Sequence, residues 1–178
     1  SLVLQRHFSR MDISFISRYQ TLSNADLDLG TRVDRTFIDT FLRATYNISD
    51  KSSVESRFQN EIHDYDVGSS SVTWQNENFW DYRLKPKTHL GFGAAFGRLE
   101  YQRGDSQVFE RALARVLYSP TQKISLKAKV GLDFRQFDSG TDTLDPIFTL
   151  GGTYLPFNGT TISLEGSRDV ESTAQNSR

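Results

Sequence analysis

The sequence of 178 residues contains no cysteine and only four prolines. The lack of cysteine excludes disulfide bonds, cysteine nucleophiles and cysteine-ligated metals. No run approaches the ~20 consecutive apolar residues that a membrane-spanning helix needs, and the mean hydropathy is −0.51. Basic and acidic residues nearly balance, at 21 and 22, so charge gives no reason to expect a nucleic-acid partner. Aromatic residues are plentiful at 12%, and this composition argues against a disordered chain.

One stretch, from Ile124 to Phe134, alternates strictly between two kinds of side chain. Its even-numbered positions are apolar, and its odd-numbered positions are polar, charged or glycine. A period of two over more than ten residues predicts an extended strand with two chemically different faces. Strands in soluble sheets have ~5–6 residues, whereas a tilted strand that crosses a bilayer needs ~9–11. The length of this stretch therefore favours a membrane β-barrel over a soluble sandwich.

A repeat of 36 residues organises the chain around this strand. Four tyrosines keep that spacing, each at the start of a short polar turn: Tyr46, Tyr82, Tyr118 and Tyr154. Three lysines keep the same spacing: Lys51, Lys87 and Lys123. One repeat holds two strands, a tight turn and a longer loop, and therefore predicts a β-hairpin. We expect an all-β fold, an antiparallel up-and-down transmembrane β-barrel or part of one, with about eight or nine long strands.

The expected strands can be placed between the turn signals. They cover residues 12–19, 35–48, 52–65, 72–84, 88–101, 107–118, 124–137, 144–155 and 160–170, while residues 21–34 have no clear pattern. No linker divides residues 1–178, so a single β-barrel domain is expected. The chain does not open with an export signal or end in a strand that closes on an aromatic residue. We therefore expect the domain to be incomplete at both ends.

Even-numbered residues share one face through the repeats, because 36 is an even number. That face is mostly apolar, and the odd-numbered face carries charges of both signs. In a membrane barrel the apolar face contacts lipid and the other face lines the lumen. We predict the following lumen-facing charged residues as candidates for solute selectivity: Glu55, Arg57, Glu61, Arg111, Arg115, Lys127, Lys129, Asp133 and Arg135. The four repeat tyrosines are predicted to form an interfacial aromatic girdle on the apolar face.

Several residues break or complicate the alternation. Asn60, Asn76 and Asn78 are polar at even positions, while Phe79, Leu113 and Leu117 are apolar at odd positions. Gly91, Gly93 and Gly97 alternate within an expected strand that no helix follows. They are better interpreted as small inward residues that relieve crowding than as a phosphate-binding loop.

The basic residues of the odd face admit two interpretations. The five between Arg111 and Arg135 could form a stripe that steers anionic solutes through a lumen. Ordinary cross-strand pairing with Asp133, Glu110 and neighbouring acids is the interpretation that we favour.

The histidines suggest little chemistry. His63 lies beside Glu61 on the odd face, where a hydrolase site could be imagined. A histidine in a charge network is the simpler interpretation, because no serine–histidine–aspartate or metal-ligand spacing stands out. We expect no catalytic residue, no metal and no cofactor.

Three segments resemble a known family: DYRLKPKTHLGFGAAFGRLEY (81–101), RALARVLYSPTQKISLKAKVGLDFRQFD (111–138) and DPIFTLGGTYLPFNGTTISLEGSRDVE (145–171). They are similar to bacterial outer-membrane β-barrels of the beta-barrel porin type 2 group. The resemblance covers roughly the last hundred residues. It implies a Gram-negative outer-membrane location, a longer parent barrel, and an association with exopolysaccharide systems.

The expected function is porin-like passage or export of polar solutes, with exopolysaccharide as one candidate cargo. The expected partners are outer-membrane lipid and polar solutes or polysaccharide, without nucleic acid, and no oligomeric state follows from the sequence. A small closed barrel with a structural or adhesive role and no pore is the alternative, because side chains fill the interior of narrow barrels. An outer-membrane enzyme and a soluble β-barrel binding module are further alternatives.

Overall fold

The computed structural model describes residues 1–25, 32–65, 70–140, 142–157 and 159–169. Ten strands in these residues form one sheet in which each strand pairs antiparallel with its neighbours in sequence. The strands are β1 (Leu2–His7), β2 (Met11–Ala25), β3 (Arg32–Ser49), β4 (Ser52–Tyr65), β5 (Ser71–Lys85), β6 (Thr88–Tyr101), β7 (Gln107–Thr121), β8 (Ile124–Phe137), β9 (Asp142–Tyr154) and β10 (Ile162–Arg168). No helix in the described residues is long and apolar enough to span a membrane. The predicted all-β, up-and-down architecture is confirmed.

The strand count is ten instead of the expected eight or nine. β1 was not anticipated, because a strand of six residues is too short to show a clear alternation. β2 and β3 also extend into the stretch without a pattern, where Ala25 pairs with Arg32. Residues 26–31 of that stretch lie outside the described residues.

Hydrogen bonds between neighbouring turns explain the repeat of 36 residues. The carbonyls of three turn lysines accept from amides 32 positions later, in the pairs Lys51–Arg83 (2.7 Å), Lys87–Ser119 (2.9 Å) and Lys123–Leu155 (2.8 Å). Two of the lysine side chains repeat the pattern, since Lys87 Nζ donates to the Pro120 carbonyl (2.5 Å) and Lys123 Nζ to that of Pro156 (3.2 Å). Each tight turn is thus bonded to the next one along the rim of the sheet.

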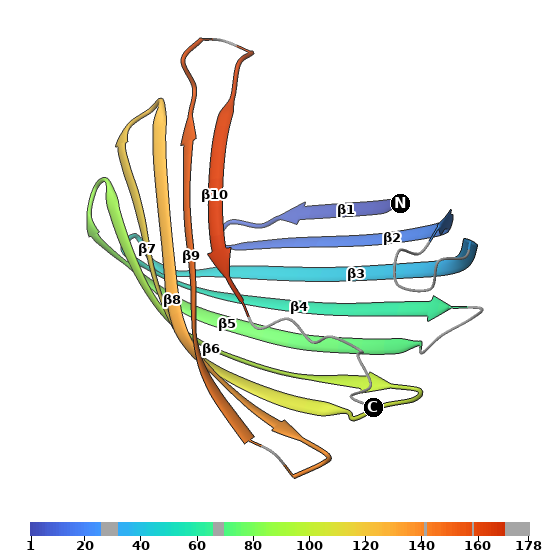
Figure 1. Ribbon diagram of the computed structural model, residues 1–178. Coiled ribbons are helices and arrows are strands. Elements are labelled where there is room, and N and C mark those ends of the chain that lie inside the picture. The colour runs from blue at the N-terminus through green and yellow to red at the C-terminus, as the bar shows by residue number, and fades with distance from the viewer. Residues whose placement is uncertain (26–31, 66–69, 141, 158, 170–178) are drawn as a thin grey trace.

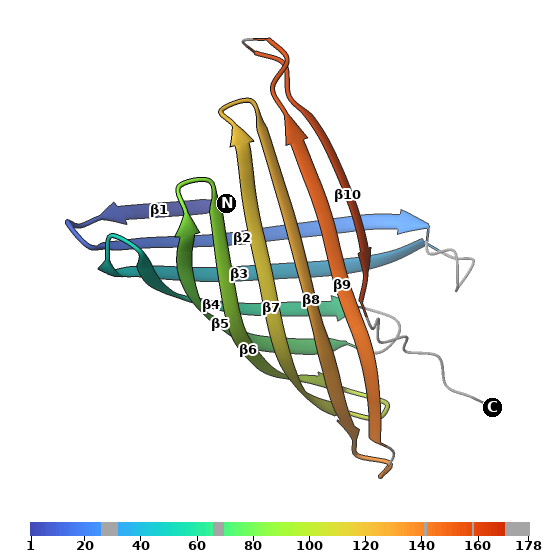
Figure 2. The ribbon, with the colours of Figure 1, turned by 90° about the vertical axis from the view of Figure 1, so that its left-hand side faces the viewer.

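The sheet is strongly twisted and curved. Figure 1 shows the strand direction rotating from β1 to β10, and Figure 2 shows the same rotation from the side. Such rotation accumulates because each strand is twisted relative to its neighbour. Among the described strands, β1 contacts only β2 and β10 contacts only β9. The described sheet is therefore open, with β1 and β10 as its edges.

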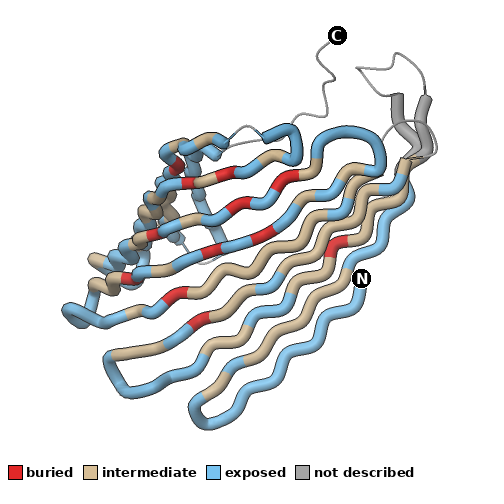
Figure 3. The backbone as a smooth tube through the Cα atoms, turned by 90° about the horizontal axis from the view of Figure 1, so that it is seen from below, coloured by how far each residue is buried: buried red, intermediate tan, exposed pale blue. Residues whose placement is uncertain are grey.

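Curvature separates an inner face from an outer face. From β3 to β10 odd-numbered residues lie on the inner face, and residues of equal parity pair across strands, as Leu42 does with Phe58. Parity is reversed between β2 and β3, because odd-numbered Phe15 pairs with even-numbered Leu42. On β2 the even-numbered residues therefore lie on the inner face. The buried residues of the described chain all lie on the inner face: Asp39, Glu55, Phe79, Gly91, Ala95, Gly97, Gln107, Phe109, Leu113, Asp133, Arg135 and Ile147. Figure 3 shows the buried positions spread along several neighbouring strands of the sheet.

Candidate functional site

The inner face carries a network of charged side chains centred on Glu55 of β4. Three arginines surround this buried carboxylate: Arg43 Nε lies 2.6 Å from Oε2, while Arg57 Nη2 and Arg115 Nη1 each lie 2.8 Å from Oε1. A carboxylate removed from water needs such partners, because an unpaired buried charge is very costly. We call the set Arg43, Glu55, Arg57, Glu77, Asp81, Arg115 and Lys129 the inner charge network.

Arg115 joins strands that are not adjacent in the sheet. From β7 its guanidinium reaches Asp81 on β5, with Nε–Oδ1 at 2.9 Å and Nη2–Oδ2 at 2.5 Å. Its register partner on the intervening strand β6 is Gly91, which has no side chain to block the path. The guanidinium also lies 3.9 Å from the centre of the Phe79 ring, in a cation–π arrangement.

The predicted role of the β6 glycines as small inward residues is confirmed. A Cβ on Gly91 would lie 2.3 Å from Asp81 Oδ1 and 2.7 Å from Arg115 Cγ. A Cβ on Gly93 would lie 2.7 Å from the Phe79 ring, and one on Gly97 would lie 2.4 Å from Cζ of Phe109. The bare backbone of β6 thus leaves room for the large side chains of β5 and β7.

Apolar side chains occupy the row of the inner face next to Arg115 and Asp81. Phe79, Ala95, Leu113 and Ile147 form a buried hydrophobic cluster there. Phe79 and Leu113 are among the apolar residues that break the alternation of the sequence. Because they stand at odd positions, their side chains lie on the inner face and pack between its charged groups.

A second group of charges surrounds Asp133 of β8, which is fully buried at 0% exposure. Arg111 Nε donates to Asp133 Oδ2 at 2.8 Å, and Arg135 donates to both carboxylate oxygens at 3.1 Å. Arg135 also donates to Gln107 Oε1 at 3.1 Å, and Arg111 Nη2 lies 3.2 Å from Oδ1 of Asp169. We call Gln107, Arg111, Asp133, Arg135 and Asp169 the Asp133 cluster.

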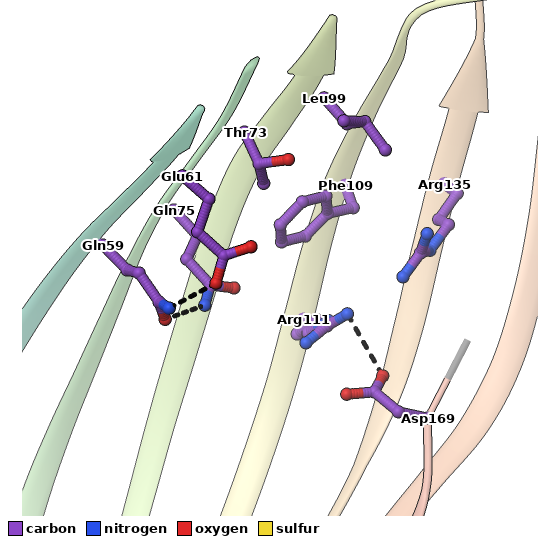
Figure 4. A pocket seen from close by; sticks show the side chains of 9 residues that line it. All are labelled: Gln59, Glu61, Thr73, Gln75, Leu99, Phe109, Arg111, Arg135 and Asp169. Carbon is purple, nitrogen blue, oxygen red and sulfur yellow. Dashed lines mark hydrogen bonds and ion pairs between the residues drawn. The ribbon is translucent and has the colours of Figure 1, made fainter. Parts of the chain in front are cut away.

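A polar cavity of about 220 Å³ lies beside the Asp133 cluster (Figure 4). Its lining residues are Gln59, Glu61, Thr73, Gln75, Leu99, Phe109, Arg111, Arg135 and Asp169. On one wall Gln75 Nε2 donates to Gln59 Oε1 (3.0 Å), and Gln59 Nε2 donates to Glu61 Oε1 (2.6 Å). The other wall holds the two arginines, whose Cζ atoms lie 4.7 and 5.4 Å from the centre of the Phe109 ring.

All nine charged residues predicted for the lumen lie on the inner face. Six of them are the buried acids Glu55 and Asp133 and the arginines Arg57, Arg111, Arg115 and Arg135 that pair with these acids. Lys129 Nζ pairs with Glu77 Oε2 at 3.3 Å, Lys127 forms an ion pair with Glu165 of β10, and Glu61 lines the cavity. Four of the five basic residues between Arg111 and Arg135 thus pair with acids on other strands, as the favoured interpretation predicts, while Arg135 pairs with Asp133 on its own strand. Glu110, also expected as a partner, lies on the outer face opposite Phe134.

The four repeat tyrosines lie on the outer face and are exposed to similar extents, from 38% to 48%. A further set of aromatic residues with the same spacing, Tyr65, Tyr101 and Phe137, lies on the inner face and is half-buried. The strand pairing is regular at that end of the sheet. The shifts in register between these strands occur at the opposite, tight-turn ends.

His63 lies in a network, as the simpler interpretation predicts. Its Nε2 is 3.8 Å from Glu61 Oε2, and its ring centre is 4.8 Å from that of Phe37. Within the described residues no group of three or more histidine, cysteine or acidic side chains could hold a metal ion.

Sequence reasoning did not single out several residues of the inner face. Parity places Arg43, Glu77 and Asp81 on the charged odd face, but they are not among the nine residues named as selectivity candidates. Asp169 is also odd-numbered and lies in the expected strand 160–170, but its contact with Arg111, 58 positions earlier, depends on the curvature of the sheet.

No protein-family model matches the chain, and no curated protein matches it. A solved structure that does match is described as "CymD monoaromatic hydrocarbon channel", with a TM-score of 0.52 and 10% sequence identity. The match covers 95% of this chain and 68% of that one. At this identity the likeness shows the fold of this chain alone. Its fold class is the antiparallel, up-and-down sheet of transmembrane β-barrels, while the beta-barrel porin type 2 resemblance stays a prediction.

Proposed function

We propose that this chain forms a wall of an outer-membrane β-barrel through which polar solutes pass along the charged inner face. The observation that carries the proposal is the inverted distribution of polarity. Asp133 and Glu55 are buried at 0% and 2% exposure, whereas Phe92 and Leu164 are exposed at 59% and 80%. In a water-soluble protein large apolar patches are covered and charges are exposed. An outer face in contact with lipid accounts for the inversion.

The outer face also carries three asparagines, and their side chains bond within the sheet. Asn60 Nδ2 donates to the Thr73 carbonyl and Asn76 Nδ2 to the Arg57 carbonyl, both at 3.1 Å. The Asn78 side-chain amide donates to that of Asn76. Because internal bonds lower the cost of placing amides next to hydrocarbon, these residues are compatible with a lipid-facing surface.

The chemistry of the inner face supports polar rather than hydrocarbon cargo. The similar solved structure is described as a hydrocarbon channel, but likeness at 10% identity concerns the fold alone. The inner face of this chain presents fixed, paired charges and amides that a hydrocarbon could not solvate. Polar solutes, with exopolysaccharide as the more specific candidate from the family resemblance, fit such a lining.

A closed structural or adhesive barrel without a pore is the second candidate. The buried cluster of Phe79, Leu113 and Ile147 favours it, because these side chains fill part of the interior. In that case the inner charges would stabilise the fold without contacting solute.

Refolding into lipid vesicles followed by planar-bilayer recording tests the proposal. We expect a folded band that shifts on boiling in SDS gels, together with stepwise conductance in potassium chloride. A heat-shifted band without conductance would favour the structural barrel. Folding in buffer without lipid or detergent would overturn the membrane location and with it the proposed function.

A further inference from the structure

We infer that the cavity beside the Asp133 cluster is a binding site for a small zwitterion, whose carboxylate contacts Arg111 and whose ammonium group contacts Glu61. The inference deepens the proposed function, because it assigns a solute class to a site on the proposed lumen face. Its basis is the difference in chemistry between the two walls of the cavity (Figure 4).

The arginine wall is built to receive a carboxylate. Asp133 is fully buried and accepts a hydrogen bond from Arg111 Nε, so it fixes the position of the Arg111 guanidinium. The Nη2 atom of Arg111 takes no part in this bond. That Nη2 atom lies 3.2 Å from a carboxylate oxygen of Asp169. The contact shows that a carboxylate fits at this position, since guanidinium groups bind carboxylates through charge-assisted hydrogen bonds.

A solute carboxylate can displace Asp169 from Arg111 at a lower cost in free energy than it could displace Asp133. The side chain of Asp169 is 55% exposed, whereas that of Asp133 is 0% exposed. Asp169 follows the edge strand β10, and its contact with Arg111 on β7 spans the interior instead of neighbouring strands. The Arg111 side chain is 13% exposed and needs a carboxylate partner, whereas Asp169 can return to water. A solute carboxylate that takes its place keeps Arg111 paired and can therefore compete with this aspartate.

The opposite wall presents hydrogen-bond acceptors and a negative charge. The amide of Gln75 donates to Gln59, and the amide of Gln59 donates to Glu61 and, at 3.3 Å, to Asp39. Both amide groups therefore use donors within the wall. The Gln59 oxygen already accepts from Gln75, so the Gln75 oxygen and the Glu61 carboxylate are the acceptors that face a solute. Within the described chain, the ion pairs of Glu61 include His63 at 3.8 Å but no arginine or lysine. A cationic donor on a solute would compensate this carboxylate.

The size of the cavity suits a small solute. Its volume of about 220 Å³ equals the liquid volume of about seven water molecules. A compact amino acid with separated charged ends can fit such a space. A solute with two anionic ends would meet repulsion at Glu61, and an uncharged one would leave Arg111 without a new partner.

Equilibrium binding to the chain refolded in detergent micelles tests the inference with three matched probes. 4-Aminobutyrate carries both charged ends, butyrate lacks the ammonium group, and butylamine lacks the carboxylate. We expect 4-aminobutyrate to bind about tenfold more tightly than either of the other two, because each loses one charge-assisted contact. Equal binding of 4-aminobutyrate and butyrate, or no binding of any probe, would overturn the inference.

Two variants assign the contacts. Glu61→Gln should reduce the affinity for 4-aminobutyrate to that for butyrate, while Asp169→Asn should raise the affinity for both carboxylates severalfold by removing the competing group. An Asp169→Asn variant with unchanged or weaker binding would overturn the assignment of Arg111. The heat-dependent gel shift of each variant confirms that it is folded.

Conductance of the same preparations separates this inference from the proposed function. A conducting barrel that binds none of the probes would overturn only the zwitterion site. Specific binding of 4-aminobutyrate by a barrel without conductance would overturn only the passage of solutes.

Discussion

Arg115 Nη1 donates to Glu55 Oε1 at 2.8 Å, although the two residues are 60 positions apart and lie on β7 and β4. Two strands separate them in the sheet. The contact exists because the sheet is curved and because Gly91 on β6 leaves the path of the arginine open. It connects the middle strands across the interior, in addition to the backbone ladder.

This relationship makes Gly91 a sensitive position. Gly91→Ala would place Cβ 2.3 Å from Asp81 Oδ1 and 2.7 Å from Arg115 Cγ. We expect a loss of about 1–3 kcal/mol in unfolding free energy, because crowding in a packed interior forces neighbours to shift. Urea titration in lipid vesicles, followed by tryptophan fluorescence, measures the change. Gly166→Ala is the control, since no atom lies within 4 Å of its added Cβ, and an equal loss in both variants would contradict the explanation.

Removal of the central carboxylate should destabilise the inner charge network. Glu55→Gln leaves Arg43, Arg57 and Arg115 without their shared negative partner, and we expect a loss of about 3 kcal/mol. Arg43 is half-exposed, so water compensates part of the effect. The matched control is Glu100→Gln, which removes a surface pair with Arg98 and should change stability by less than about 1 kcal/mol. The same urea titration compares the two, and similar small losses would show that the network contributes little.

Charge reversal on the inner face should change ion selectivity. Lys127→Glu breaks the ion pair with Glu165 and places two carboxylates together on β8 and β10. We expect the cation-to-anion permeability ratio to rise by roughly twofold, because lining charges attract counter-ions. Reversal potentials under a salt gradient measure the ratio. Lys51→Glu makes the same charge change in an exposed tight turn and should leave the ratio nearly unchanged; equal shifts would indicate that Lys127 does not line the path.

The two faces of β9 should differ in their tolerance of charge. Leu150 is 54% exposed on the outer face, and Leu150→Asp should lower folding stability in lipid by up to about 2 kcal/mol. Thr149→Asp changes the adjacent residue of the inner face, where Lys129 lies directly opposite. We expect that variant to fold with little loss. The fraction of heat-shifted protein after refolding measures both, and equal effects would disprove the assignment of the outer face to lipid.

Sequence alone determined the local architecture of this protein. The alternation from Ile124 to Phe134 predicts the length of a strand and the face on which each side chain lies. The 36-residue repeat predicts which strands pair, and it is marked by Tyr46, Tyr82, Tyr118 and Tyr154. They do so because side chains of a strand alternate by backbone geometry and a tight turn forces the next strand to pair with the last. The six-residue strand β1 was missed, since too few residues reveal the period.

Only the tertiary structure decided which side chains meet inside the sheet. Parity places Glu55, Arg115 and Asp133 on one face but does not state how far a side chain reaches across it. Curvature brings β4 toward β7 and carries Asp169 to Arg111, and these contacts join residues 60 and 58 positions apart. Such distances depend on the accumulated twist of every intervening strand, which no local stretch of sequence encodes.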